Sequence, residues 1–452
     1  HKWVMSFDLN SLYPHLIMQY NMSPDTYLLH KFNQEISVKQ LLEGEVDITS
    51  LTNTTVTPNG AMFNIDKQGF LPELLEEMYD ERVLFKNKMI QHKKELENTP
   101  KEDTITRKRL EYAITAENNN QMAKKIALNS CYGALGNQWF RYFNRDIAEG
   151  ITTAGQLSIK WVEKAVNEYL NKLLETDEDY VVAIDTDSIY VTFEKLISKV
   201  NPKNPIEFLD TIAKEKLEPM INESYEELAS YMNAYQNKMV MGREVIADKG
   251  IWTAKKRYIL NVHDSEGVRY RSPRLKMMGI ETAKSSTPMW CRKKLEQGIK
   301  VVMNGTESDV WQFIEDASNE FKKLPIEEIS FPRGVQNVTN YHNAASIYKK
   351  GTPIHVRGSL LYNNLLHKYN IEKKYPVITN GEKIKFCYLK IPNIINENVI
   401  SFVNAMPKEF EIEPYIDFDT QFRKSFVEPL GVILDKIGWT TEPVSNLDNF
   451  FG

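Results

Sequence analysis

The chain has 452 residues, of which 42% are apolar and 26% charged, and its net charge is −5. This balance is typical of a globular protein and excludes a collagen, a disordered tail and a membrane bundle. No stretch approaches the roughly 18 apolar residues of a membrane span, and the three cysteines lie too far apart for a disulfide framework or a CxxC metal site. At about 150 residues per domain we expect two to four domains.

The first 70 residues predict short elements. Val4–Phe7 indicates a strand that ends at Asp8, and residues 11–20 indicate a short helix with Pro14 in its first turn, where proline is tolerated. Residues 47–60 are polar and rich in Thr and Asn, which predicts a loop or hairpin.

Two long helical patterns follow, over residues 71–97 and 104–135, separated by Asn98-Thr-Pro100. They predict a helical hairpin of about 60 residues, long enough to project from the body of the protein. A further helix is predicted over residues 154–175, and a β-hairpin over residues 181–191.

The rest of the chain predicts strands and then helices. Residues 251–262 indicate a strand that pairs with residues 269–278. From Pro288 onward the pattern is mostly helical, apart from a β-like stretch around residues 351–358 that contains Gly and Pro.

Charge is distributed unevenly. Between Lys249 and Lys294 there are 12 Lys and Arg residues against three acidic residues, so this block carries +9 and the other 406 residues carry −14. Such a block favours a polyanion bound at one place. A solvated, charge-rich face explains the charge alone equally well.

Carboxylates stand at the ends of two predicted strands. Asp8 follows the first strand, and Asp185 and Asp187 lie in the turn of the predicted β-hairpin. Mg²⁺ prefers oxygen ligands of this kind, and two ions about 3.5–4 Å apart can activate a hydroxyl and stabilise a leaving oxygen. The carboxylates can meet only if the two strands lie side by side. Each Asp taken alone is more typical of a turn or cap.

The predicted helical hairpin supplies cations. Arg82, Lys86 and Lys93 share one face of its first helix, and its second helix has a polar and aromatic face. That second face comprises Gln121, Lys125, Asn129 and Tyr132. The two faces suit a triphosphate with a base stacked beyond it. Most basic stripes are solvated helix faces, but Gly133 and Gly136 indicate that something approaches the end of the second helix closely.

Within the basic block, Thr253–Tyr258 would place three cations and an aromatic side chain on one strand. Alternation would put Lys256 and Tyr258 on one face and Lys255 and Arg257 on the other. Such a strand can hold a nucleic-acid backbone without reading its sequence.

Four motifs carry a resemblance to the family B DNA polymerases, in the branch of the T-even-type bacteriophages. Asp8-Leu-Asn-Ser-Leu-Tyr-Pro14 resembles motif A, and Lys125-Ile-Ala-Leu-Asn-Ser-Cys-Tyr-Gly133 resembles motif B. Asp185-Thr-Asp-Ser188 resembles motif C, and Lys255-Lys-Arg-Tyr258 resembles the basic strand that grips the primer terminus. Four motifs in the correct order over nearly the whole chain are highly specific.

The resemblance implies an α+β fold with right-hand architecture. Its parts would be a palm with an antiparallel sheet at residues 1–69 and 135–280, helical-hairpin fingers at 70–134, and a mostly helical thumb at 281–452. It implies a DNA-directed DNA polymerase core that transfers nucleotidyl groups from dNTPs to a primer 3′-hydroxyl, with two Mg²⁺ ions that Mn²⁺ could replace. The implied setting is phage DNA replication in the cytoplasm of a bacterial host, with no membrane partner.

The resemblance also implies roles for single residues. Asp8, Asp187, Asp185 and Lys125 would be catalytic, and Asp8 and Asp187 would bind the metals together with the carbonyl of Leu9. The residues that would bind the dNTP are Arg82, Lys86, Lys125, Asn129, Ser11, Leu12, Tyr132 and Tyr13, the last as a steric gate under the sugar. The residues that would contact DNA are Lys255, Lys256, Arg257, Tyr258 and Gly133. Glu244 would lie near the metals.

The chain departs from the family pattern in three respects, one of which is a fingers hairpin shorter than that of the T-even type. Ala183-Ile184 replaces the usual Tyr-Gly before motif C. The chain also begins just before motif A, which implies that the family's N-terminal and 3′–5′ exonuclease domains have no counterpart in it. A separate chain that carries those domains is therefore an expected partner, besides primer-template DNA and dNTPs.

The alternative from another class is a catalytically inactive DNA-binding subunit, or an inert fragment of a split polymerase. The presence of Asp8, Asp187 and Lys125 together argues against it. A reverse transcriptase is a third interpretation, but it would carry Asp-Asp in the hairpin where this chain has Asp-Thr-Asp.

The C-terminal tail ends in three large apolar residues, Leu447, Phe450 and Phe451, with no chain left to cover them. They could fold back onto the thumb or enter an apolar pocket on a partner. The tail resembles the clamp-binding peptide of T-even-type polymerases, which implies docking on a sliding clamp.

Overall fold

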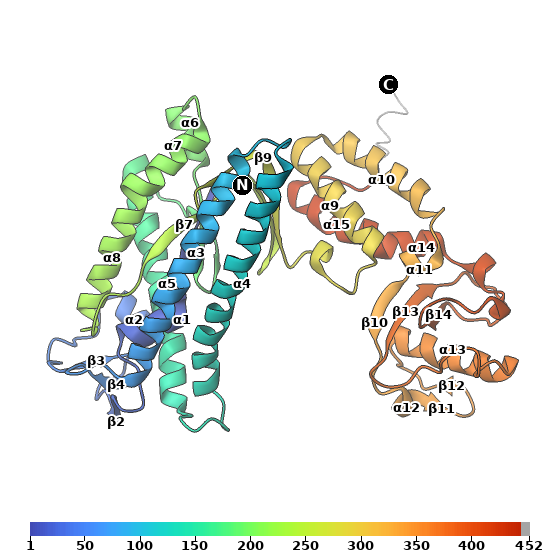
Figure 1. The fold of residues 1–452 in the computed structure, drawn as a ribbon, viewed down its shortest axis with the longest axis horizontal. Coiled ribbons are helices and arrows are strands. Elements are labelled where there is room, and N and C mark those ends of the chain that lie inside the picture. The colour runs from blue at the N-terminus through green and yellow to red at the C-terminus, as the bar shows by residue number, and fades with distance from the viewer. Residues whose placement is uncertain (444–452) are drawn as a thin grey trace. The chain divides into compact units, whose positions relative to one another are not determined.

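The computed structural model describes residues 1–443, and Figure 1 shows its ribbon. The chain divides into two compact units. Unit 1 comprises residues 1–250 and 260–274, and unit 2 comprises residues 251–259 and those from 275 onward. Helices and antiparallel sheets occur in both, which confirms the predicted α+β class.

Unit 1 is built on the largest sheet, in which the strand order is β5-β6-β1-β7-β8-β9. The strands are β1 (Lys2–Leu9), β5 (Val181–Asp185), β6 (Ser188–Thr192), β7 (Met241–Ala254), β8 (Arg257–Ser265) and β9 (Val268–Met278). The ends of β7, β8 and β9 belong to unit 2. A second, three-stranded sheet is formed by β2 (Tyr27–Lys31), β4 (Ala61–Asn64) and β3 (Thr54–Val56), in that order.

The helices of unit 1 are α1 (Leu12–Gln19), α2 (Val38–Leu42), α3 (Phe70–Asn98), α4 (Thr104–Leu135), α5 (Arg145–Leu174), α6 (Glu194–Val200), α7 (Pro205–Ile212) and α8 (Glu218–Tyr231). A single π-helical stretch, Ala213–Leu217, joins α7 to α8. The core lies where α1, α5 and α8 meet the large sheet, and Phe7, Leu16, Val162, Ile189 and Tyr225 are all at most 1% exposed in it.

The predicted helical hairpin is confirmed by α3 and α4, which run side by side (Figure 1). The hairpin starts from a tightly packed base, since a Cβ on Gly69 would lie 2.6 Å from the Cβ of Ser23. The predicted helix over 154–175 is longer than expected. It begins at Arg145, because the side chain of Asn144 caps it by accepting a 3.1 Å hydrogen bond from the N–H of Ile147.

The prediction of one strand over residues 251–262 is wrong. Lys255 and Lys256 form a turn between β7 and β8, and Lys256 has a positive φ of 61°. The predicted separation of Lys255 and Lys256 onto opposite strand faces therefore does not hold.

Unit 2 contains helices and small sheets. Its helices are α9 (Met289–Asn304), α10 (Glu307–Phe321), α11 (Ile326–Ile329), α12 (Val338–Tyr341), α13 (Ile354–Tyr369), α14 (Phe418–Phe422) and α15 (Glu428–Leu434), with a π-helical stretch at Arg423–Val427. Its strands are β10 (Phe331–Gly334), β13 (Lys383–Tyr388) and β14 (Val399–Phe402) in one sheet, and β11 (His342–Asn343) and β12 (Ile347–Tyr348) in another. Short 3₁₀ turns lie at Glu281–Ala283, Lys408–Phe410, Glu413–Tyr415 and Asp435–Ile437.

The β-like stretch predicted around residues 351–358 is wrong as well, because α13 begins at Ile354. Gly358 has a packing role there: a Cβ on it would lie 2.5 Å from the hydroxyl of Ser401 on β14. The strands of this region lie instead at β10, β13 and β14, which the sequence prediction missed.

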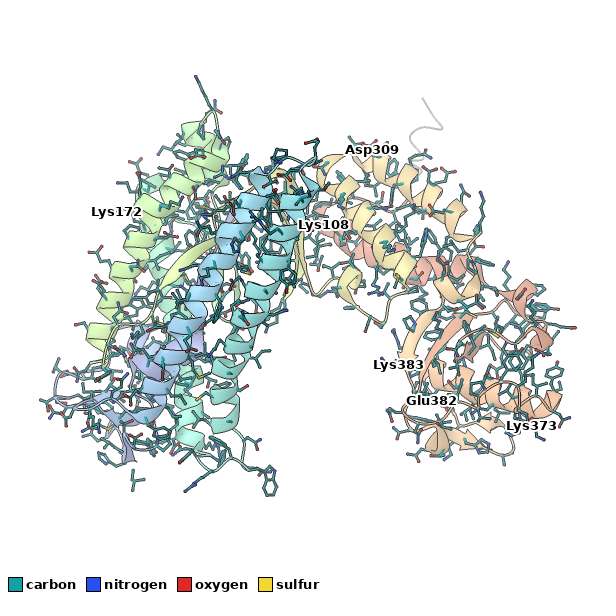
Figure 2. All side chains as sticks on the ribbon, in the orientation of Figure 1. Lys108, Lys172, Asp309, Lys373, Glu382 and Lys383 are labelled. Carbon is teal, nitrogen blue, oxygen red and sulfur yellow. The ribbon has the colours of Figure 1, made fainter. Side chains whose placement is uncertain are left out.

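Each unit carries charged side chains on its surface, and Figure 2 labels several of them. Lys108 on α4 and Lys172 on α5 are exposed on unit 1, and Asp309 on unit 2 completes a capping box with Thr306 at the start of α10. Within residues 1–443, no helix combines the length and apolar character needed to cross a lipid bilayer.

Candidate active site

Asp8 and Asp187 are brought together by neighbouring strands of the large sheet. β1 and β6 pair antiparallel with Asp8 opposite Ser188, so Asp187 lies next to the end of β1. The main-chain N–H of Leu9 donates a 2.8 Å hydrogen bond to the carbonyl oxygen of Asp187, which fixes this arrangement. Asp185 lies in the same turn, and its carbonyl accepts a 2.7 Å hydrogen bond from the N–H of Asp187.

A third carboxylate approaches from the other neighbour of β1. β7 pairs with β1 through Gly242 opposite Asp8, and the register shifts between Ser6 and Phe7. The shift leaves Glu244 between paired residues, where its carboxylate accepts a 3.1 Å hydrogen bond from the hydroxyl of Ser6. The role of Glu244 was open at the sequence level, and the bulge explains why its side chain comes near Asp8.

This concentration of negative charge shifts the pKa values of the carboxyls. Burial, together with the charges of Asp187 and Glu244, raises the pKa of Asp8 to about 7, although Lys86 and Lys125 act to lower it. Burial also raises the pKa of Asp187, and the charge of Asp185 acts in the same direction. Both carboxylates thus lie where a positive charge would be stabilising.

Cations face these carboxylates from the helical hairpin. Arg82 and Lys86 of α3 and Lys125 of α4 line the same cavity as Asp8, with a volume of about 510 Å³. The guanidinium of Arg82 is 8% exposed and donates a hydrogen bond to the hydroxyl of Ser11. The structure therefore places the predicted triphosphate-binding cations and the carboxylate of motif A around one space within unit 1.

The start of α1 forms a further side of the site. Tyr13 packs against Tyr132 of α4, and burial, followed by the influence of Tyr132 and Asp187, raises the pKa of Tyr13. The side chain of Leu12 is only 4% exposed and lies in the core, so Leu12 can present only its main chain to a ligand. Gly155 of α5 makes room for this arrangement, because a Cβ there would lie 3.4 Å from Leu12.

The far end of α4 is open. Asn129 is exposed, and a Cβ on Gly133 would meet no described atom within 4 Å. The sequence predicted that something approaches this end of α4 closely. At Gly133 the structure has open space there rather than a packed part of the chain.

The basic segment Lys255–Tyr258 belongs to unit 2. Lys255 and Lys256 are exposed in the turn between β7 and β8, whereas Arg257 donates to both oxygens of Glu281 at 2.7 and 2.8 Å. Tyr258 is 4% exposed and stacks on Trp252. Arg257 and Tyr258, two of the five residues predicted to contact DNA, are thus partly engaged within the protein.

Several residues of the cavity were missed by sequence reasoning. Besides the predicted residues, the cavity is lined by Lys94, Lys214, Glu218, Arg243 and Glu266, among others. No motif contains them. Lys94 reaches the cavity from α3, and the other four come from segments that the large sheet and the helices α7 and α8 bring together. Near Arg243, only Glu244 was singled out from the sequence, and it is the next residue in the chain and also lines the cavity.

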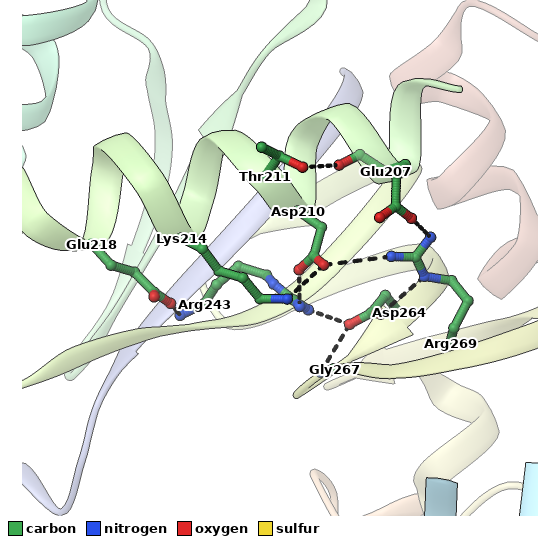
Figure 3. A network of polar contacts seen from close by, with 9 residues as sticks. All are labelled: Glu207, Asp210, Thr211, Lys214, Glu218, Arg243, Asp264, Gly267 and Arg269. Carbon is green, nitrogen blue, oxygen red and sulfur yellow. Dashed lines mark hydrogen bonds and ion pairs between the residues drawn. The ribbon is translucent and has the colours of Figure 1, made fainter. Parts of the chain in front are cut away.

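A buried ion network supports this side of the cavity (Figure 3). The guanidinium of Arg243 bonds to Asp264 and, at 2.6 Å, to Asp210. Arg269 donates to Asp264 at 3.0 Å, and Lys214 donates to Asp210 at 2.7 Å. The side chains of Arg243 and Asp264 are only 4% and 2% exposed, so their charges depend on each other for stabilisation.

The predicted clamp-binding residues, Leu447, Phe450 and Phe451, lie outside the described residues. Within residues 1–443, no group of three or more His, Cys, Asp and Glu side chains is arranged to hold a metal ion by itself.

Carboxylates that can bind divalent ions, placed opposite cations that can bind phosphate, suit enzymes that act on phosphate esters, among them phosphatases, nucleases and polymerases. The sequence profile of the family described as DNA polymerase family B matches residues 1–421, and the chain belongs to this family.

Curated relatives agree with the family assignment. The chain is 33% identical to the DNA-directed DNA polymerase of Enterobacteria phage T4, over 100% of this chain and 55% of the phage protein. It is also 33% identical to the DNA-directed DNA polymerase of Escherichia phage RB69, over 95% of this chain and 53% of that protein. A DNA polymerase of Pyrococcus glycovorans is 30% identical over 49% of this chain and 23% of its own length. The chain thus spans about half the length of the phage relatives.

Proposed function

We propose that the chain is the polymerase core of a phage replicative enzyme, and that it extends a DNA primer by transferring nucleotidyl groups from dNTPs. The observation that carries this proposal is the cavity in which Asp8 faces Arg82, Lys86 and Lys125, with Asp187 in the turn just before the adjoining strand β6. Relatives named DNA-directed DNA polymerases in two phages support it, as does the shared family. Replication in a bacterial host would follow from the same relationship.

In this proposal the chain forms the palm, fingers and thumb of a right hand. Residues 1–69 and 135–280 would be the palm, residues 70–134 the fingers and residues 281–452 the thumb. The long hairpin of α3 and α4 supports the fingers assignment.

The carboxylates fit divalent metal ions. Asp8 and Asp187 provide hard oxygen donors, and the pKa of Asp8 is raised first by burial and then by the neighbouring charges of Asp187 and Glu244. Two protein carboxylates are the usual complement of an Mg²⁺ site whose other ligands are substrate phosphates and water. The main-chain carbonyl of Leu9 is a further oxygen for the site, and Asp185 and Glu244 would support it from nearby.

The chain's own residues would bind and orient the substrates. Arg82, Lys86 and Lys125 would hold the triphosphate, and the main-chain N–H groups at the start of α1, from Ser11 and Leu12 onward, would help because a helix N-terminus favours phosphate. When bound, the metal ions would activate the primer hydroxyl and stabilise the leaving oxygen. Much of the catalysis would come from this positioning and charge neutralisation.

Other residues would shape the nucleotide and DNA sites. Tyr13 would exclude a 2′-hydroxyl, and Asn129 and Tyr132 would flank the new base pair near Gly133. Lys255 and Lys256 would hold the primer duplex through its phosphates, with Arg257 and Tyr258 keeping their turn in place.

Primer extension with Mg²⁺ tests the proposal. We expect the Asp187→Asn chain to lose extension almost completely while it still folds and binds primer-template DNA, because the substitution removes a metal-binding charge but not the duplex contacts. Asp177→Asn, at an exposed carboxylate beyond α5, is the matched control and should extend normally. Substantial turnover by the Asp187→Asn chain would contradict the two-metal assignment, and absence of extension by the wild type would favour the inactive-subunit alternative.

Clamp binding by the C-terminal tail stays a prediction from the sequence. Removal of residues 446–452 should leave synthesis on short primers unchanged and abolish stimulation by the cognate sliding clamp on long templates. Loss of basal activity or of thermal stability in the truncated chain would instead mean that the tail belongs to the fold.

A further inference from the structure

One of the predicted triphosphate-binding cations already has an anionic partner inside the cavity. The ammonium of Lys86, on α3, lies 2.6 Å from a carboxylate oxygen of Glu266, in the turn between β8 and β9. Both side chains line the cavity that also holds Asp8, Arg82 and Lys125, and all five residues belong to unit 1. The pair is half-buried, with side-chain exposures of 27% and 30%.

The main chain of Glu266 is held in a defined position. Its N–H donates a 2.7 Å hydrogen bond to the carbonyl oxygen of Glu244, and its φ of 52° lies in the left-handed region. The next residue, Gly267, donates its N–H to the carboxylate of Asp264 at 2.9 Å. Asp264 is in turn bonded by Arg243 and Arg269 in the buried network of Figure 3. The Glu266 carboxylate is thus presented by a rigid turn, whereas Lys86 is a flexible side chain on a helix.

The charge of Glu266 also reaches a second cation of the site. Burial lowers the pKa of Arg82, and the carboxylate of Glu266 acts against this lowering. An anion at the position of Glu266 therefore stabilises two of the positive charges that a triphosphate would meet.

We propose that the carboxylate of Glu266 takes the place of a nucleotide phosphate in the nucleotide-free chain. It pairs with Lys86, and this ion pair must break before a triphosphate can bind. Glu266 would be a positioning residue that acts through Lys86 and sets the affinity for the incoming nucleotide. The inference rests on the proposed role of Lys86 in triphosphate binding. It predicts that the chain binds nucleotide more weakly than its cations alone would allow, because each binding event breaks an ion pair.

Equilibrium binding of inorganic triphosphate to the full chain, measured by calorimetry without DNA, tests this competition directly. Glu266→Gln keeps the shape and the main-chain hydrogen bonds of the turn but removes the charge. We expect it to lower the Kd for inorganic triphosphate about threefold to fivefold, the range for loss of one half-buried ion pair. In primer extension the KM for dNTP should fall by a similar factor, while kcat changes less than about twofold.

A matched control separates charge competition from tethering of the helix. The carboxylate of Glu97, near the end of α3, pairs with Arg274 of β9, so this second ion pair ties the same helix to the same hairpin. Neither residue lines the cavity. Glu97→Gln should leave the Kd and the KM unchanged. An equal gain in affinity from Glu97→Gln would mean that both substitutions merely loosen α3, and would overturn the proposal.

A double substitution tests whether the effect passes through Lys86. In a Lys86→Met background, Glu266→Gln should no longer change the affinity for inorganic triphosphate, because no ion pair remains to be broken. A persistent gain would place the action of Glu266 elsewhere. Equal affinity of the wild-type and Glu266→Gln chains, including undetectable binding by both, would also overturn the proposal.

The proposed polymerase function and the proposed role of Glu266 can be contradicted independently of each other. If the wild type extends primers but Glu266→Gln leaves the KM and the Kd unchanged, the proposed polymerase function stands and the role of Glu266 is wrong. If no variant extends primers but Glu266→Gln still tightens inorganic triphosphate binding in a Lys86-dependent manner, the ion-pair competition stands and the polymerase proposal fails.

Discussion

The aromatic rings of Tyr13 and Tyr132 lie with their centroids 4.5 Å apart and their planes inclined by 38°. This contact joins the first turn of α1, directly after the Asp8 strand, to the face of α4 that carries Lys125. It holds the Tyr13 ring from one side, while α1 packs on α5 from the other. A ring fixed in this way can act by its bulk.

We therefore expect Tyr13→Ala to incorporate ribonucleotides more readily by roughly one to two orders of magnitude relative to dNTPs, because the space under the sugar is opened. The measurement is the ratio of kcat/KM for an rNTP and the matching dNTP in primer extension. Tyr13→Phe keeps the bulk and removes only the hydroxyl, so it should discriminate as the wild type does. Unchanged discrimination in Tyr13→Ala would remove the steric role.

Lys125 should contribute mainly to binding of the triphosphate. Lys125→Met removes a cation that faces the carboxylates and the cavity, and we expect the KM for dNTP to rise about tenfold or more, as for loss of a charge-assisted hydrogen bond. Lys108→Met, at an exposed position on the same helix (Figure 2), is the control and should leave the KM unchanged. Similar KM values for both variants would show that α4 does not contact the nucleotide.

Lys256 should hold DNA by charge alone. Lys256→Ala is expected to weaken binding of primer-template DNA irrespective of its sequence, and to reduce the slope of log affinity against log salt by about 0.9, the value for one lost phosphate contact. Lys383→Ala removes an exposed cation on β13 of the same unit and is the control (Figure 2). An unchanged salt slope in Lys256→Ala would place the DNA elsewhere.

His15 predicts a dependence of stability on pH. Burial lowers the pKa of His15 to about 4, and its ring packs edge-on against Tyr79, so α1 and α3 meet around a neutral imidazole. The unfolded chain binds a proton near pH 6.5 whereas the folded chain does not, so stability is full above pH 6.5 and is lost as the pH falls toward 4. The loss amounts to about 3 kcal/mol. Urea unfolding of the wild type and of His15→Gln at pH 7 and pH 4.5 measures it as the difference between the two chains, because the pKa of Asp8, raised to about 7 by burial, makes both chains gain stability as the pH falls over the same range.

The helical hairpin could be predicted from the sequence because α3 and α4 are long and strongly patterned, and local periodicity is enough to define them. The carboxylates could be found because Asp8, Asp185 and Asp187 follow short apolar runs that form strands. The sequence could predict that these carboxylates meet only on the condition that their strands pair. That condition is the pairing of β1 with β6, which lie far apart in the chain.

The missed features depend on turns and close packing rather than on pattern. Lys256 takes a positive φ without the Gly or Asn that would normally signal such a turn, so the alternating residues around it resemble one continuous strand. Gly358 looked like a break, but it allows α13 to approach β14. Glu266 and Arg243 reach the cavity because of the β-bulge in the pairing of β7 with β1 and because of the buried ion network. Nothing in the local sequence indicates the bulge or the network.

The tightly packed base of α3 has a mechanical consequence. Gly69 holds the start of the helix against Ser23, and from there Arg82 lies about 20 Å along the axis and Glu97 about 42 Å. A tilt of about 10° around Gly69 would carry Arg82 by about 3 Å and Glu97 by about 7 Å. A tilt around Gly69 therefore moves the end of α3 near Glu97 roughly twice as far as Arg82, so the cation that lies nearer the packed base is the one whose position changes less.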